Sequence, residues 1–172
     1  MTRNRLIVTL ALFAGLVACD HGTKIAAKSQ LEGKPPAMLV RGAIDLSYHE
    51  NYGIAFNLER VVPEPARLPV YVLFTSAIMI GLGVAWWRRR SELSWTTVGY
   101  AFIAAGAVGN LLDRIVRGYV VDFVHIHGWP VFNAADVWIG VGVGCLVVAM
   151  LRQRRAPKPP VPPAVTTPTA TS

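Results

Sequence analysis

Three aspartates stand beside carboxamide and arginine side chains at the ends of long apolar segments. Asp113 follows Gly-Asn-Leu-Leu and precedes an arginine, Asp122 follows Gly-Tyr-Val-Val, and Asp136 ends the run Phe-Asn-Ala-Ala-Asp. Ionisable groups at membrane depth are costly, so they mark a functional site by default. The pattern therefore indicates acid–base chemistry within a membrane.

Asp122 and Asp136 are the pair that the chain order brings together most naturally. Asp122 lies between Val-Val and Phe-Val after the third apolar segment, and Asp136 opens the fourth. Two close carboxyl groups in a low dielectric cannot both ionise, so one keeps a proton while the other acts as a base. Such a pair titrates as a unit and can activate water against an amide carbonyl without a metal ion.

Structural interpretations stand beside this one. Asn133 followed three residues later by Asp136 is typical of a helix N-cap, which leaves capping and catalysis equally open. Four polar residues share one face of the third segment if it is helical: Asn110, Asp113, Arg114 and Arg117. The arginines would complement the helix dipole there, but Asn110 lies farther into the apolar run and must face protein or water.

Three further groupings have their own alternatives. Asp20 and Lys24 stand in the favourable i, i+4 order for an ion pair, which either ends the first apolar segment or braces the site. The run Asn-Tyr-Gly from Asn51 is typical of a turn. His125 and His127 would point the same way in an extended segment and raise the alternative of a metal site. No third ligand is evident in the sequence, so we expect no metal.

Composition and run length favour a membrane protein. The chain has 172 residues, of which 53% are hydrophobic, and a mean hydropathy of +0.41. We predict four spanning helices, each near the roughly 20 residues that a bilayer requires, at about 6–26, 68–87, 93–112 and 134–151. Small residues recur at four-residue spacing and would let helices approach closely: Ala11 and Gly15, Ala105 and Gly109, and Gly140 and Gly144.

Outside the spans, the polar stretch 27–67 is predicted to form a small extramembrane sheet, because residues 39–48 alternate in polarity between turn signals. Pro63, Pro65 and Pro69 mark the start of the second span. Residues 1–155 then make one membrane domain. The tail 156–172 is rich in Pro, Thr and Ala and is predicted to be disordered.

The arrangement of basic residues predicts orientation. Short loops and tails on one side of the predicted bundle carry Arg3, Arg5, residues 88–90, Arg152 and Arg154, which predicts cytoplasmic termini. The net charge of +7 follows from this flanking bias and gives no reason to expect nucleic acid binding.

Five blocks in order resemble the lipoprotein signal peptidases, also called signal peptidase II. The blocks are Asp20-x-x-Thr-Lys24, Asn51-x-Gly53-x-Ala-Phe, Gly-Asn110-x-x-Asp113-Arg114, Gly-x-Val-x-Asp122-Phe and Phe-Asn133-x-Ala-Asp136. They extend from the first predicted span to the fourth, and only the Pro-rich tail lies outside. Ala105 and Asn57 depart from the residues common in this family, and neither touches the aspartate pair.

The resemblance implies an all-α membrane protein of four transmembrane helices with a small extracytoplasmic β-sheet cradle. It implies an aspartic endopeptidase of the bacterial inner membrane that removes the signal peptide from diacylglyceryl-modified prolipoproteins, without a cofactor and as a monomer among membrane lipids. It makes Asp122 and Asp136 catalytic and Asp113 a structural partner of Arg114. The implied substrate-binding or supporting residues are Asp20, Lys24, Asn51, Gly53, Asn110, Arg114 and Asn133.

Two other classes of protein compete with this interpretation. Arg3 and Arg5, a short apolar run and Leu-Val-Ala-Cys19 resemble a lipoprotein signal, which would make the chain itself a lipidated binding protein. That interpretation leaves the Asp122 and Asp136 blocks unexplained. The buried acids would also suit a small proton-coupled transporter, but the sequence shows no broken helices or repeated halves.

Overall fold

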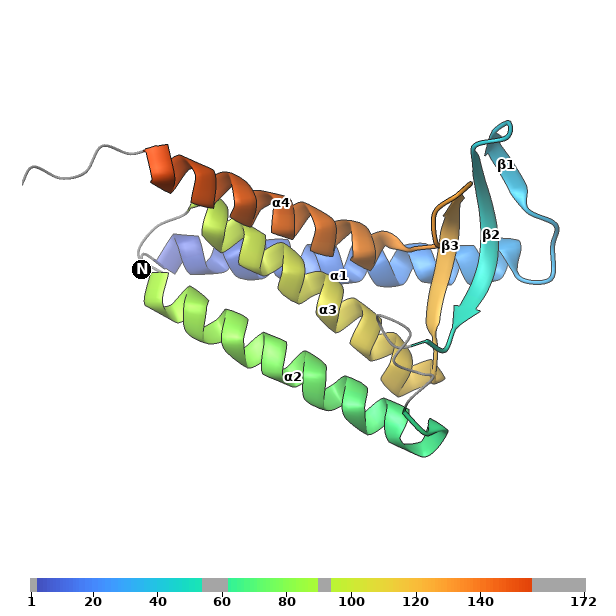
Figure 1. The fold of residues 1–172 in the computed structure, drawn as a ribbon, viewed down its shortest axis with the longest axis horizontal. Coiled ribbons are helices and arrows are strands. Elements are labelled where there is room, and N and C mark those ends of the chain that lie inside the picture. Colours follow the sequence, from blue (N-terminus) through green and yellow to red (C-terminus); the bar gives the residue numbers. More distant parts are fainter. Residues whose placement is uncertain (1–2, 54–61, 90–93, 156–172) are drawn as a thin grey trace, which may run out of the picture.

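Four long helices and a small sheet make up the computed structural model, which describes residues 3–53, 62–89 and 94–155. Figure 1 shows the helices running side by side and the sheet lying at one end of them. The elements in chain order are α1 (Arg3–Leu31), β1 (Ala37–Val40), β2 (Ile44–Asn51), α2 (Glu64–Arg89), α3 (Trp95–Arg117), β3 (Val120–Ile126) and α4 (Ala134–Arg155). This is the predicted fold class of four apolar helices with a small sheet.

All four helices are long and apolar enough to cross a membrane. The candidate spans are Asn4–Leu31, Glu64–Arg88, Trp95–Arg117 and Ala134–Gln153. Large apolar side chains lie exposed along them, including Leu73 and Val116, each 72% exposed. Exposed apolar surface of this extent indicates an apolar environment around the helices, which a bilayer supplies.

α1 and α2 extend farther than the predicted spans. α1 continues to Leu31, and α2 begins at Glu64, so Pro65, which precedes the predicted second span, lies inside α2 together with Pro69. Pro65 occupies the first turn, where a backbone N–H has no partner within the helix. Pro69 removes one helical hydrogen bond, a loss that membrane helices tolerate.

The sheet is antiparallel in the order β1-β2-β3. β1 and β2 lie in the stretch predicted to form strands, whereas β3 lies after the third predicted span, in a segment that was not predicted to join the sheet. β2 pairs with β3 from Ile44 opposite Ile126 to Asn51 opposite Val120, with a register shift between Leu46 and His49. β3 therefore fixes the position of Asp122 against β2.

α3 packs against the other three helices and positions the site. Ser94 caps its start, and Gly118 ends it in the left-handed conformation with φ of 82°. α3 and α4 approach so closely that a Cβ added to Gly106 would lie 2.3 Å from the backbone oxygen of Ala135. At Gly142, an added Cβ would lie 2.7 Å from the backbone oxygen of Gly99. The approach brings the end of α3 next to the start of α4.

Candidate active site

Asp122 and Asp136 come from β3 and from the first turn of α4. Asp122 is 3% exposed, and Asp136 is half-buried. The elements meet where the carboxyl end of α3, the start of α4 and the sheet converge. The structure therefore brings the predicted pair into one polar cluster.

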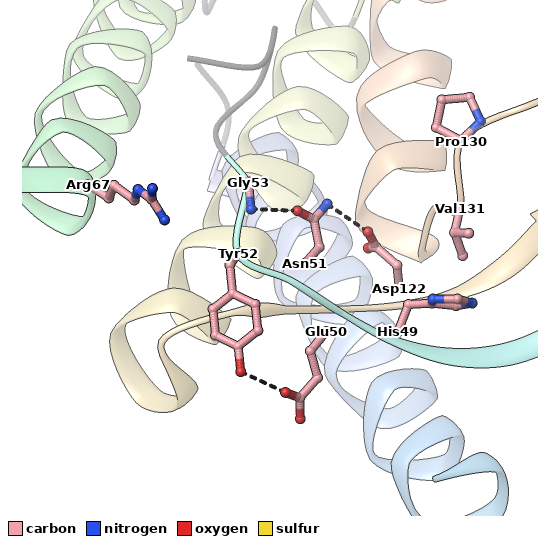
Figure 2. A pocket seen from close by; sticks show the side chains of 9 residues that line it. All are labelled: His49, Glu50, Asn51, Tyr52, Gly53, Arg67, Asp122, Pro130 and Val131. Atoms are coloured by element: carbon pink, nitrogen blue, oxygen red, sulfur yellow. Dashed lines mark hydrogen bonds between the residues drawn. The ribbon is translucent and has the colours of Figure 1, made fainter. Parts of the chain in front are cut away.

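Both oxygens of Asp122 accept hydrogen bonds from carboxamides. Asn51 Nδ2 donates to Oδ2 at 2.8 Å, and Asn133 Nδ2 donates to Oδ1 at 2.6 Å. Asn51 pairs with Val120 in the sheet, two residues before Asp122, so the period of two puts both side chains on the same face. Figure 2 shows the Asn51 amide between the Asp122 carboxyl group and the backbone N–H of Gly53, which donates to Asn51 Oδ1 at 2.8 Å.

Asp136 accepts hydrogen bonds from Asn110 and Asn133. Asn110 Nδ2 donates to Oδ1 at 2.9 Å, and the backbone N–H of Asn133 donates to Oδ2 at 3.2 Å. The backbone N–H of Asp136 donates in return to Asn133 Oδ1 at 3.2 Å. This reciprocal pair is a capping arrangement at the start of α4, so the capping and site interpretations of Asn133 hold together.

Two asparagines join the carboxyl groups. Asn133 Nδ2, which donates to Asp122, also donates to Asn110 Oδ1 at 3.1 Å. Asn110 in turn donates to Asp136. Burial raises the pKa of Asp122 to about 6; the hydrogen bond from Asn51 opposes that rise, and the charge of Asp136 adds to it. The pair is therefore linked by hydrogen bonds and by electrostatics.

Lys24 is a fully buried cation next to this cluster. Its ammonium lies 2.9 Å from Asp20 Oδ2 and 3.0 Å from Asp113 Oδ2, and it donates to Asn110 Oδ1 at 2.9 Å. Three partners match the three donors of an ammonium group. Asp20 also accepts from the backbone N–H of Ala135 at 2.9 Å. The i, i+4 pair expected from the sequence is thus part of a network that joins α1, α3 and α4.

Asp113 has different partners from the one predicted. The structure gives it ion pairs with Lys24 and Arg117, and its Oδ2 accepts from the backbone N–H of Val121 at 3.2 Å. Its role stays structural, but Arg117, one turn farther along α3, takes the place expected for Arg114. Helical spacing favours Arg117, which stands four residues after Asp113, because neighbouring residues such as Asp113 and Arg114 do not face each other on a helix.

Arg114 instead spans from α3 to the loop after β2. It donates to the backbone oxygen of Asn110 at 3.1 Å and to that of Gly53 at 3.0 Å. The guanidinium carbon lies 3.5 Å from the ring centroid of Tyr71 on α2, at cation–π distance. Sequence analysis missed Tyr71, because it sits in an apolar run where a tyrosine gives no signal of a site.

Pockets open beside both carboxyl groups. Asp122 lines one of about 430 Å³, shown in Figure 2 with Asn51, Gly53 and Arg67 around it. Asp136 lines another of about 530 Å³ with apolar neighbours that include Trp129 and Phe132. The Ala-Phe part of the predicted Asn51 block, residues 55–56, lies outside the described residues. Among the described residues, the group of side chains that could hold a metal ion is Asp45, His125 and His127, and it contains neither Asp122 nor Asp136.

Comparison with known proteins identifies the family. A family model described as signal peptidase (SPase) II matches residues 12–152. The chain belongs to the signal peptidase II family. It is 33% identical to the lipoprotein signal peptidase of Geobacter metallireducens over 90% of this chain and 96% of that protein. It is 34% identical to the lipoprotein signal peptidase of Mycobacterium avium over 84% of this chain and 79% of that protein.

The fold has solved counterparts. A bacterial membrane enzyme determined by the in meso method at 2.3 Å resolution superposes with a TM-score of 0.74 at 22% identity, covering 90% of this chain and 94% of that one. The family, the aspartic peptidase class and the fold expected from the five sequence blocks are thereby confirmed. As a signal peptidase II, the chain is a multi-pass membrane protein with four candidate spans. The roles of individual site residues remain predictions.

Proposed function

We propose that this signal peptidase II cleaves diacylglyceryl-modified prolipoproteins on the N-terminal side of the lipidated cysteine, with Asp122 and Asp136 as its catalytic pair. The observation that carries the proposal is the joining of the two carboxyl groups through Asn110 and Asn133. Four amide or backbone donors hold the four carboxyl oxygens in place, so the pair is preorganised. The relatives, each named a lipoprotein signal peptidase, support the substrate class.

The chemistry needs a water molecule and two protons in defined places. One carboxylate takes a proton from water as the water oxygen bonds to the scissile carbonyl carbon, and the other carboxyl group gives its proton to the carbonyl oxygen. The tetrahedral intermediate then collapses as the C–N bond breaks. The amine leaves with the proton that the first carboxyl group took, and the second regains its own.

The surroundings favour Asp122 as the proton donor in this scheme. Burial raises its pKa to about 6. Asp136 lies in the first turn of α4 and accepts a hydrogen bond from the backbone N–H of Asn133. With Asp122 as the donor, the water-activating role is left to Asp136.

Supporting residues would place the substrate backbone. Arg114 binds Gly53 O, so α3 holds the loop after β2 beside the Asp122 pocket. Asn51 reaches Asp122 from the end of β2, directly before that loop. The diacyl chains of the substrate would stay in the bilayer against the apolar outer faces of the helices. Lys24 and Asp20 act indirectly, because they position Asn110 and the start of α4.

We propose that both termini are cytoplasmic and that the pair faces the outer side of the inner membrane. In Figure 1 the start of α1 and the end of α4 lie at the same end of the bundle, and the sheet lies at the other. The basic residues on the short loop and tails support this orientation. We also propose that the enzyme acts as a monomer, because donors from Asn51, Asn110 and Asn133 of the same chain already reach all four oxygens of the aspartate pair.

The competing interpretation of residues 16–19 as a lipidation box fits the fold poorly. Cys19 lies within the continuous helix α1, directly before Asp20. Cleavage before Cys19 would separate the site residues Asp20 and Lys24 from most of their helix. We expect the intact mass of the purified protein to include residues 1–18, and a loss of these residues with a lipid increment would favour the lipoprotein interpretation.

A cleavage assay with matched substrates tests the proposed function. Purified protein in detergent is incubated with one prolipoprotein in diacylglyceryl-modified and unmodified forms, with and without chelator. We expect cleavage directly before the lipidated cysteine, unaffected by chelator and lost without the lipid. Equal cleavage of the unmodified form would contradict the substrate class, and inhibition by chelator would contradict the aspartic mechanism. Cleavage without an ion gradient separates the peptidase from a transporter.

A further inference from the structure

We propose that Asp45, His125 and His127 form a binding site for one divalent transition-metal ion, with zinc the first candidate, that links β2 to β3. The sequence alone offered the two histidines and no third ligand. The structure supplies the third from the neighbouring strand: one ligand atom from each residue lies within 4.8 Å of the others. The proposal is independent of the peptidase reaction.

Strand register brings the three side chains together. Asp45 on β2 is the register partner of His125 on β3, so both project from the same face of the sheet. His127 follows two positions later, and its backbone N–H donates to Ala43 O at 3.0 Å, which keeps it beside β2. The two imidazole rings lie 5.1 Å apart between centroids. His127 Nε2 and Asp45 Oδ2 are 2.7 Å apart.

The donor set suits zinc. Two imidazole nitrogens and a carboxylate oxygen are ligands that zinc accepts at about 2.0–2.1 Å, which puts tetrahedral ligand atoms roughly 3.4 Å from one another. The ligand atoms of Asp45, His125 and His127 now lie within 4.8 Å of one another. Side-chain rotations that move these atoms by about 1 Å would give the tetrahedral spacing without a change in the strands. The side chains of Asp45 and His127 are 15% and 48% exposed, so an ion can reach them from water. Three protein ligands leave a fourth position for water.

The three proposed ligands do not include either aspartate of the pair. His125 lies three residues after Asp122 on β3, about 10 Å along the strand, and the period of two turns it to the opposite face. His127 lines the pocket that Asp136 also lines, so a bound ion would lie near that pocket but would hold the sheet rather than either carboxyl group of the pair. It would cross-link the two strands that carry Asn51 and Asp122, at the end of the sheet away from Asn51.

A calorimetric titration tests the site directly. Full-length protein purified without a polyhistidine tag and freed of metal by chelator is titrated with zinc chloride. We expect one equivalent to bind. His127→Ala and Asp45→Asn should each weaken binding at least tenfold, whereas His21→Ala, an exposed histidine on α1, should leave it unchanged. Zinc should raise the melting temperature of the wild type but not that of His127→Ala.

The outcomes separate this site from adventitious binding and from the catalytic proposal. Absence of saturable binding, or equal weakening by His21→Ala and His127→Ala, would overturn it. The melting temperature of metal-free His127→Ala should fall only slightly below that of the metal-free wild type, because the contact that it loses with Asp45 is partly exposed; a cooperative transition shows that the variant is folded. Peptidase activity should persist in chelator whether or not zinc binds. The zinc titration therefore tests the metal site, and the cleavage assay tests the proposed function, each without depending on the other.

Discussion

Asn133 performs three tasks with one side chain and its backbone. Its Nδ2 donates to Asp122 and to Asn110, its Oδ1 caps α4, and its N–H holds Asp136. From the sequence, capping and participation in the site were alternatives. They coincide here because Asp136, which we propose as a catalytic residue, sits in the first turn of the helix that Asn133 caps.

Replacing Asn133 by serine separates these tasks. A serine oxygen still caps the helix, but the buried Nδ2 donor to Asp122 and Asn110 is lost, so stability should fall by about 1–3 kcal/mol. We expect kcat to fall by about 100-fold with little change in KM, because the carboxyl groups lose the amide that joins them. Asn4→Ser, at the exposed far end of α1, serves as the control. An active Asn133→Ser would show that the bridge is not needed.

The pKa of Asp122 predicts how stability depends on pH. The folded value of about 6 lies above the ordinary value of 3.8, so the folded protein binds this proton more tightly than the unfolded chain does. The stabilisation is complete below about pH 4 and is lost as the pH rises through about 6. The difference between the folded and the ordinary pKa of Asp122 corresponds to a change of about 3 kcal/mol in the free energy of unfolding.

This pH dependence of stability is tested by the melting temperatures of the wild type and Asp122→Asn, measured from pH 4 to pH 8. The wild type should lose stability relative to the variant as the pH rises, because asparagine does not titrate. Parallel curves for the two proteins would contradict the raised pKa.

Single residues were predictable from the sequence where a motif fixed them, and not where the partner lies in another element. Asp122, Asp136 and the asparagines were found by their types and order. Lys24 was paired with Asp20 from helical spacing, but its contact with Asp113 depends on how α1 and α3 meet. The partners of Arg114 could not be predicted, because Gly53 and Tyr71 are distant in sequence.

At the scale of elements, the close approach of α3 and α4 determines where the pair meets. The predicted small-residue pairs identified only part of this contact. Within the described part of the chain, a Cβ added to Gly15, Gly140 or Gly144 would meet no atom within 4 Å, whereas one added to Gly106 would clash with α4. Spacing shows which residues share a helical face, but not which face meets a neighbour.

Two glycine substitutions test this contact. Gly106→Ala should destabilise the protein by about 1–3 kcal/mol and reduce activity, because the new methyl group would lie 2.3 Å from the Ala135 backbone oxygen. Gly140→Ala should be neutral or stabilising by up to about 1 kcal/mol, since alanine favours a helix and space is free there. Thermal unfolding in detergent measures both. Equal melting temperatures for the two variants would show that the helices can separate without loss.

β3 shows the limit of element prediction. Its sequence is rich in β-branched residues, yet its pairing partner β2 lies about 70 residues earlier, so no local signal states that the segment joins a sheet. The same pairing brings Asp45 to His125. The position of Asp122 against β2 and the proposed metal site therefore could not be predicted without knowing that β2 pairs with β3.

At the scale of the whole molecule, the buried polar cluster lies at one end of an otherwise apolar bundle. α1 supplies Lys24, α3 supplies Asn110 and α4 supplies Asp136, so the cluster joins three of the four helices. Composition and run length predicted the four helices correctly, because the bilayer sets their length. The tail 156–172, predicted to be disordered, lies outside the described residues.

Reporter fusions test the proposed orientation. A periplasm-active phosphatase joined after Lys34, which lies beyond the sheet-side end of α1, should be active, and the same enzyme joined after Ser172 should be inactive. A reporter that is active only in the cytoplasm should give the opposite pattern. Phosphatase activity at the C-terminal junction would contradict the predicted topology.

The most direct test of the central claim compares three variants on one substrate. Asp122→Asn, Asp136→Asn and the control Glu32→Gln, an exposed acid directly after α1, are purified and confirmed as folded by thermal unfolding. The cleavage of a diacylglyceryl-modified prolipoprotein is then followed by mass spectrometry. We predict that both site variants lose turnover by at least about 10⁴-fold while Glu32→Gln cleaves at the wild-type rate. Near wild-type cleavage by folded Asp122→Asn or Asp136→Asn would contradict the assignment of the catalytic pair.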